Sequence, residues 1–120
     1  MKKEAEKRNT KLIASYHNFK KTPKKKELES ILKKLLLYET DYVKIACFCR
    51  NEEDMLRLLS ISKLNPKVVP VGMGNYGPLF RVLSPFFNIP FTYASSKRNK
   101  NIAPGQIFYK ELEDKWLEIL

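Results

Sequence analysis

Lys44 is the residue of this chain whose surroundings most clearly suggest chemistry. It lies in the middle of the short apolar run 42–46 (YVKIA), whose length and content are typical of a buried strand. Taking an ammonium group out of water costs roughly several kcal/mol unless the group is paired or loses its proton. A desolvated lysine therefore tends toward the neutral amine, the form that attacks a carbonyl carbon to make a Schiff base. The pattern predicts a nucleophile.

The alternative for Lys44 is an inward-facing lysine that forms an ion pair with a carboxylate. The apolar runs that we interpret as strands are 12–17, 42–48, 68–73 and 91–94, and none of them contains Asp or Glu. Because a neighbouring strand offers no acidic partner, we favour the nucleophile interpretation.

The two cysteines lie on the same predicted strand as Lys44. Cys47 and Cys49 are one residue apart, which is not the Cys-x-x-Cys spacing of a zinc or thiol-redox site. Alternation along a strand places both on the face opposite Lys44. We expect buried free thiols, no metal site, and a reducing, cytoplasmic setting.

The formal net charge of +10 raises the question of nucleic acid. The basic clusters fall on predicted loops and outer helix faces; they are Lys20-Lys21, Lys24-Lys25-Lys26, Lys33-Lys34 and Lys97-Arg98-Asn99-Lys100. The chain has no paired zinc ligands and no RNA-binding aromatic strand motif, so a solvated basic surface is favoured over a nucleic-acid site. No apolar run has the length of a membrane span, and the first residues lack the apolar region of a signal peptide.

Strand and helix patterns alternate along the chain. Residues 2–9 resemble the last turns of a helix, and further helices are predicted over about 23–39, after Asn51, from Pro78 to near Pro85, and over about 109–120. Thr22 is expected to cap the second of these, and Asn51 with Asp54 the third. Four strand–helix units imply parallel strands in one domain, 1–120, which is half of an eight-unit barrel.

Four short segments resemble the type I 3-dehydroquinate dehydratases. They are 14–19 (ASYHNF), 43–46 (VKIA), 73–77 (MGNYG) with Arg81, and 103–106 (APGQ). They occur in family order, each within a predicted strand or at or after its carboxyl end, and His17 precedes Lys44 by 27 residues, as in the family. The resemblance covers nearly the whole chain but only the second half of the family's barrel. It implies an α/β fold, the parallel (βα)₄ half of a TIM barrel.

The resemblance also implies roles. The family are lyases of the shikimate pathway that convert 3-dehydroquinate to 3-dehydroshikimate without a metal or cofactor. Lys44 would form an imine with the substrate ketone, and His17 would move the protons of the elimination. Arg81, Gln106 and Met73 would bind the substrate, the arginine through its carboxylate. Without the resemblance, we would interpret the histidine, arginine and glutamine as a strand-end, a helix-surface and a turn residue.

The chain departs from the family at two positions near these segments. Phe80 and Ile102 stand where the family usually has serine. The family's first four βα units have no counterpart here, and with them is missing the glutamate that orients the catalytic histidine. We therefore expect activity to need a complementary N-terminal half or a second copy of the chain. The alternative function is a non-catalytic basic binding module, or a truncated remnant, on a half-barrel scaffold.

Overall fold

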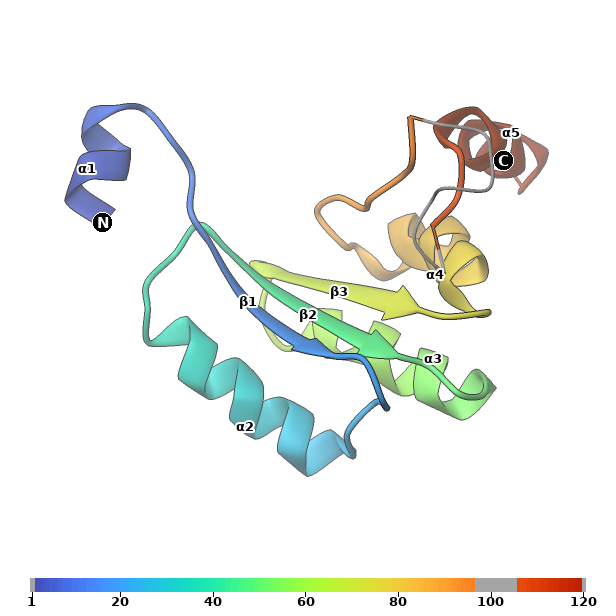
Figure 1. Ribbon diagram of the computed structural model, residues 1–120, viewed down its shortest axis with the longest axis horizontal. Helices are drawn as coiled ribbons and strands as arrows, with labels where there is room; N and C mark the ends of the chain where they lie inside the picture. The colour runs from blue at the N-terminus through green and yellow to red at the C-terminus, as the bar shows by residue number, and fades with distance from the viewer. Residues whose placement is uncertain (1, 97–105, 120) are drawn as a thin grey trace.

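A three-stranded parallel sheet forms the centre of the fold (Figure 1). The structure is a computed structural model that describes residues 2–96 and 106–119. The strands are β1 (Ile13–Asn18), β2 (Tyr42–Phe48) and β3 (Val68–Met73), and they lie in that order across the sheet. The central strand β2 pairs in parallel with both neighbours, which confirms the predicted arrangement for these three strands.

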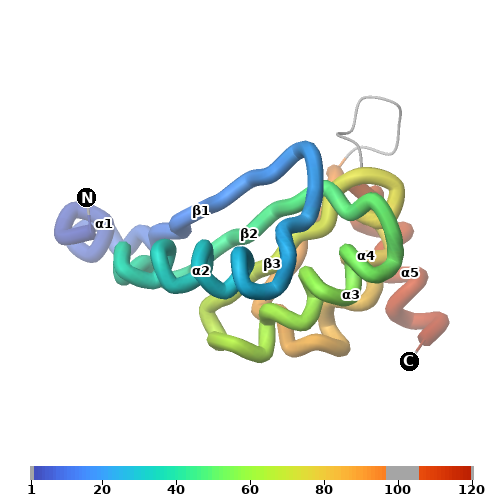
Figure 2. The backbone as a smooth tube through the Cα atoms, turned by 90° about the horizontal axis from the view of Figure 1, so that it is seen from below, coloured from blue at the N-terminus to red at the C-terminus, as the bar shows by residue number. Residues whose placement is uncertain are grey.

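The helices connect and flank the strands as the sequence pattern predicts. They are α1 (Lys2–Lys7), α2 (Lys25–Leu36), α3 (Glu52–Ser60), α4 (Gly77–Leu83) and α5 (Tyr109–Ile119), with 3₁₀ turns at Ile61–Lys63 and Ser84–Phe87. The crossovers α2 and α3 lie along the same face of the sheet, as Figure 1 and Figure 2 show. Helix α1 lies at the amino-terminal end of β1, whereas α4 lies beside the carboxyl-terminal part of β3, with α5 next to it.

The hydrophobic core lies between the sheet and these two crossover helices. Alternate residues of β2, namely Val43, Ile45 and Cys47, are fully buried on this face. They belong to one cluster with leucines of α2 and α3, namely Leu28, Leu32, Leu58 and Leu59. Both cysteines are free and buried, as predicted, and burial raises the pKa of the Cys47 thiol to about 12. Because side chains alternate along a strand, Lys44 is directed to the opposite face of the sheet.

The two predicted helix caps have different outcomes. The cap at Asn51 is confirmed, because its side-chain oxygen accepts a hydrogen bond from the Asp54 amide at 2.8 Å. The cap at Thr22 is wrong: α2 begins after Lys24, which makes no side-chain capping bond. The Thr22 hydroxyl instead donates to the carbonyl of Phe48, the last residue of β2, at 2.9 Å.

The predicted fourth strand at 91–94 is also wrong, because this segment does not form a strand ladder with β3. The guanidinium group of Arg81 lies between the segment 91–94 and β3. Its Nη1 donates to the carbonyl of Gly72 on β3 at 2.8 Å, and its Nε donates to the carbonyl of Tyr93 at 3.0 Å. A side chain thus bridges backbone groups that a strand pair would join directly. Beyond this segment a parallel bridge pairs Ser95 with Phe108.

The basic clusters of the described residues lie at the surface of the molecule. The lysines of the first three clusters, 20–21, 24–26 and 33–34, are exposed. The fourth cluster, 97–100, lies outside the described residues. None of the helices within 2–96 and 106–119 is long and apolar enough to cross a membrane.

Candidate active site

The open face of the sheet, opposite α2 and α3, carries Lys44. In the strand register Lys44 lies beside Ser15 of β1, and His17 lies two residue pairs further toward the carboxyl end, beside Ala46. Paired residues of a parallel sheet point to the same face, so both side chains rise from the open face. A rise of about 3.3 Å per residue and a strand spacing of about 4.8 Å separate their Cα atoms by roughly 8 Å. That distance admits a small molecule between the two side chains.

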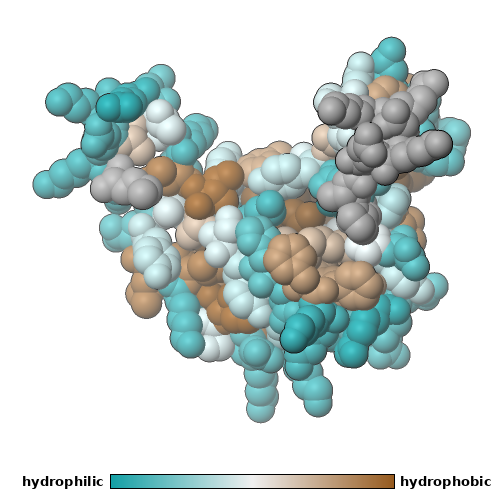
Figure 3. All heavy atoms as spheres, viewed as in Figure 1, coloured by the Kyte–Doolittle hydropathy of each residue, from teal (hydrophilic) through white to brown (hydrophobic). Residues whose placement is uncertain are grey.

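The surroundings leave this face accessible. His17 is exposed and Lys44 is partly buried. The space-filling view in Figure 3 is hollowed between α1 and the end of the molecule that carries α4 and α5. Met73, at the carboxyl end of β3, also belongs to this face, because it pairs with Phe48, which is four residues beyond Lys44. The register therefore places three of the predicted site residues on one face of the sheet.

The Lys44 amine has an aromatic neighbour in place of an acidic one. Its Nζ lies over the ring of Tyr93, 4.4 Å from the centroid. No carboxylate within the described ranges forms an ion pair with this amine. Burial lowers the pKa of Lys44, and the positive charge of Arg81 lowers it further. Both causes favour the neutral amine, the nucleophilic form.

Arg81 is a buried residue whose side chain donates hydrogen bonds to the backbone, and it does not lie on the helix surface. It is 1% exposed, and its Nη1 donates to the carbonyls of Gly72 and Gly77 at 2.8 and 2.9 Å. Together with the Nε bond to Tyr93, these contacts use three of the five N–H donors of the guanidinium group. Burial lowers the pKa of Arg81 to about 10. Within the described part of the chain, no hydrogen bond uses the two Nη2 donors.

His17 is held by an aromatic contact. Its ring stacks on that of Phe19, with centroids 5.9 Å apart and an interplanar angle of 23°. Phe19 itself is 73% exposed, so the pair stands at the edge of the open face. No acidic side chain among residues 2–96 and 106–119 pairs with the imidazole.

The loop after β3 is shaped by close backbone contact. Gly74 has a φ of +87°, and a Cβ atom there would lie 2.5 Å from the ring of Phe48. Only glycine accommodates both conditions without strain. The peptide carbonyl of Met73 accepts from the Cys49 amide at 3.1 Å, which fixes the start of this loop against the end of β2.

Gln106 is the described end of the last predicted motif. It is partly buried and precedes Ile107, whose carbonyl accepts a hydrogen bond from the Ser95 amide at 2.7 Å. This bond anchors the chain just after Gln106 to the segment that carries Tyr93. The rest of the motif, residues 103–105, lies outside the described residues, as does Ile102.

Phe80 fills the core and does not line the open face. It is fully buried, and a Cβ atom added to Gly72 would lie 2.6 Å from its ring. Gly72 pairs with Cys47, so a side chain at position 72 would point toward the face that the helices cover. A phenylalanine at this position therefore packs on the helix side of the sheet and leaves the Lys44 face unchanged.

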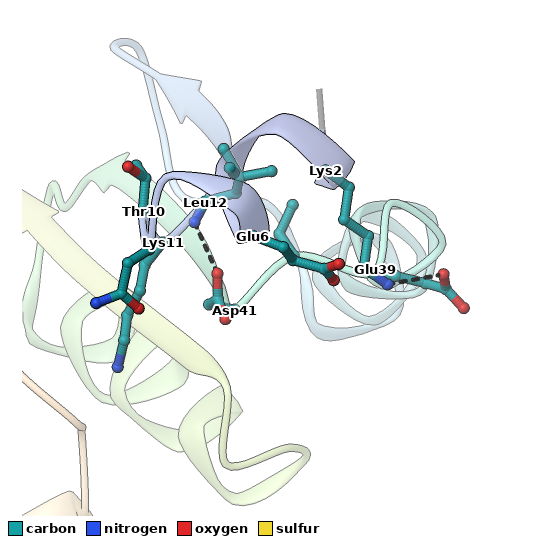
Figure 4. A pocket seen from close by; sticks show the side chains of 10 residues that line it. Lys2, Glu6, Thr10, Lys11, Leu12, Glu39 and Asp41 are labelled. Atoms are coloured by element: carbon teal, nitrogen blue, oxygen red, sulfur yellow. Dashed lines mark hydrogen bonds and ion pairs between the residues drawn. The ribbon is translucent and has the colours of Figure 1, made fainter.

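A separate cavity of about 280 Å³ opens at the other end of the strands (Figure 4). Its wall includes α1 and the segment that precedes β2, where Asp41 accepts a hydrogen bond from the Leu12 amide at 2.7 Å and Lys2 pairs with Glu39 at 3.4 Å. Active sites of parallel barrels lie at the carboxyl ends of the strands, whereas this cavity lies at their amino-terminal ends. This cavity is not the candidate site.

Tyr93 is the site residue that the sequence pattern did not single out. We interpreted the run 91–94 as a strand, and this hid the position of the ring over Lys44. The remaining signal in the sequence was two aromatic residues, Phe91 and Tyr93, close to the family's last motif. Their rings pack edge to face with centroids 5.8 Å apart.

The sequence of the chain matches a model of a known protein family over nearly its whole length. The model for type I 3-dehydroquinase matches residues 1–118. The chain belongs to the type I 3-dehydroquinase family. The family membership explains why the four motifs occur in the same order and why the strands run in parallel.

Relatives of known name support the assignment. A 3-dehydroquinate dehydratase of Methanocaldococcus jannaschii is 41% identical over 108 residues, which is 89% of this chain and 48% of the relative. One from Dehalococcoides mccartyi is 37% identical over 100 residues, 82% of this chain and 45% of the relative. The chain spans about half the length of the curated relatives it matches.

Solved structures show the same fold. A type I 3-dehydroquinate dehydratase from Clostridium difficile with covalently modified comenic acid is 32% identical, with a TM-score of 0.81 over 96% of this chain and 47% of that one. The 3-dehydroquinate dehydratase from Aquifex aeolicus is 31% identical, with a TM-score of 0.82 over 99% of this chain and 53% of that one. The parallel α/β fold predicted from the sequence is thereby confirmed as part of a dehydroquinase TIM barrel.

Proposed function

We propose that this chain carries the lysine half of a 3-dehydroquinate dehydratase site. The observation that carries the proposal is the Lys44 amine, which is desolvated, lacks an acidic partner among the described residues, and is directed to the open face of the sheet. In a protein of this family, such an amine fits attack on the substrate ketone. The reaction is the loss of water from 3-dehydroquinate, giving 3-dehydroshikimate.

Lys44 and His17 divide the chemistry of this mechanism. The neutral amine adds to the ketone carbon, and the ketone oxygen leaves as water, so that a protonated imine remains. This iminium draws electrons from the adjacent carbon, whose proton His17 removes as a base. His17 then donates the proton to the hydroxyl that leaves, and water hydrolyses the imine to release product. The exposed imidazole, which lies on the neighbouring strand two residue pairs from Lys44, suits both transfers.

The substrate contacts follow from the same face. The Nη2 donors of Arg81 are available for the substrate carboxylate, while its other donors hold the backbone. Met73 would supply apolar contact from the end of β3, and Gln106 would approach from the segment before α5. The mechanism needs no metal and no cofactor, and a cytoplasmic setting suits the two free cysteines.

A partner would complete the site. β1 is an edge strand, and an apolar groove of about 320 Å³ runs beside it between the strand and α2. An open edge and an open apolar groove favour association. We propose that a complementary half, or a second copy of this chain, covers the edge and brings a carboxylate to His17.

Borohydride trapping tests the proposal. The chain is incubated with 3-dehydroquinate and borohydride, alone and with a dehydroquinase N-terminal half, and the adduct is mapped by mass spectrometry. We expect a reduced adduct on Lys44 that Lys44→Arg abolishes. Labelling at other lysines, or equal labelling of the Lys44→Arg variant, would refute the assignment. Absence of any adduct in both conditions would favour the alternative, a non-catalytic basic module or remnant.

A further inference from the structure

We propose that Tyr93 is a positioning residue that holds the Lys44 amine, and later its iminium, against the face of its ring. The inference rests on the proposed function for the role of the amine. It adds a residue outside the predicted site and a reason why the lysine remains in place without an acid. The geometric basis is the distance of 4.4 Å between Nζ and the ring centroid, well inside the range of a cation–π contact, about 6 Å.

The ring is fixed by two independent contacts. The carbonyl of Tyr93 accepts from Arg81 Nε at 3.0 Å, and that guanidinium group is itself tied to the carbonyls of Gly72 and Gly77. The side chain packs edge to face on Phe91, whose own ring packs on Tyr42 with centroids 5.0 Å apart. The ring is therefore held from both its backbone and its edge, although no strand ladder contains it.

An aromatic face suits this amine better than a carboxylate does. A neighbouring carboxylate stabilises the ammonium and raises a lysine pKa, commonly by about one to three pH units, which would suppress the nucleophile. The ring quadrupole attracts the cation more weakly, so the amine is oriented and still able to lose its proton. Other titratable groups at this face are Arg81 from α4, His17 from β1 and the phenols of Tyr42 and Tyr93, and none of them is a carboxylate.

The same contact favours the covalent intermediate. When Lys44 attacks a ketone, the nitrogen–carbon bond forms and the carbonyl oxygen departs as water, with one proton from the nitrogen and one from solvent. The nitrogen then carries the positive charge in a double bond to carbon. That charge lies where the ammonium charge lay, so the face of Tyr93 stabilises it as well.

The test measures the pKa of Lys44 directly, without requiring turnover. The full chain is labelled with trace acetic anhydride from pH 7 to 11, and each lysine peptide is quantified by mass spectrometry, with the exposed Lys63 as internal reference. Tyr93→Leu retains an apolar side chain but removes the ring face. We expect the labelling midpoint of Lys44 to fall by about half a pH unit, because the ring favours the ammonium by roughly 0.7 kcal/mol. Tyr93→Phe, the matched control, should remain close to wild type.

Two outcomes would overturn the proposal. One is an unchanged or higher Lys44 midpoint in Tyr93→Leu when its melting curve matches that of Tyr93→Phe. If Tyr93→Leu does not fold, ring-fluorinated phenylalanine at position 93 replaces it, because fluorine weakens the ring face while keeping its shape. The second outcome that would overturn the proposal is a Lys44 labelling midpoint that does not change as fluorine atoms are added to the ring. A lowered midpoint without any dehydroquinate adduct would sustain the Tyr93 contact and refute only the proposed function.

Discussion

Replacing Arg81 tests whether a buried guanidinium group substitutes for a missing strand pair. Arg81→Met removes three hydrogen bonds to the carbonyls of Gly72, Gly77 and Tyr93. Bonds from a charged donor contribute roughly 2 kcal/mol each, so their loss removes about 6 kcal/mol. Burial, which lowers the pKa of Arg81 to about 10, costs roughly 3 kcal/mol at 1.36 kcal/mol per pH unit. The net loss of stability is therefore about 3 kcal/mol.

Urea unfolding followed by circular dichroism measures this loss at a fixed protein concentration. Arg50→Met is the matched control, because the Arg50 side chain is 61% exposed and lies 3.8 Å from Asp54, a pair that contributes less than about 0.5 kcal/mol. Hydrogen exchange adds a local readout: amides of residues 91–95 should exchange faster in Arg81→Met and not in the control. If Arg81→Met unfolds at the same urea concentration as Arg50→Met, the buried guanidinium group does not stabilise the fold by joining these backbone segments.

Three further predictions follow from the site, the core and the sheet edge. His17→Ala should abolish turnover while imine trapping on Lys44 stays detectable, and loss of trapping in a folded variant would contradict this division of roles. The raised pKa of Cys47 means that the folded state binds more protons above pH 9, so stability should fall by roughly 1 kcal/mol between pH 8 and 10. Cys47→Ala should reduce that slope and leave the part due to Cys49, whose pKa burial also raises, whereas an unchanged slope would refute the contribution of Cys47. Sedimentation at micromolar concentration should show self-association of the isolated chain, whereas a monodisperse 14.1 kDa monomer would refute it.

The sequence alone was enough for elements whose signal is local. Alternation along 42–48 predicted a buried strand with Lys44 on one face and both cysteines on the other, because the side-chain period of a strand is two. The cap at Asn51 was equally local, since donor and acceptor are three residues apart. The four motifs were also sufficient to indicate the family that the comparison then established.

Tertiary structure decided the features that depend on contacts between distant residues. The run 91–94 has residue types that are typical of strands. However, the side chain of Arg81 donates hydrogen bonds to the carbonyls of Tyr93 and of Gly72 on β3, so these bonds stand in place of a strand ladder. Thr22 is a residue type that commonly caps helices, but here its hydroxyl donates to the carbonyl of Phe48, 26 residues further along the chain. The ring of Tyr93 reaches Lys44 across 49 residues of sequence. Period and propensity carry no information on such pairs, because the chain path that brings them together is set by the packing of the whole sheet.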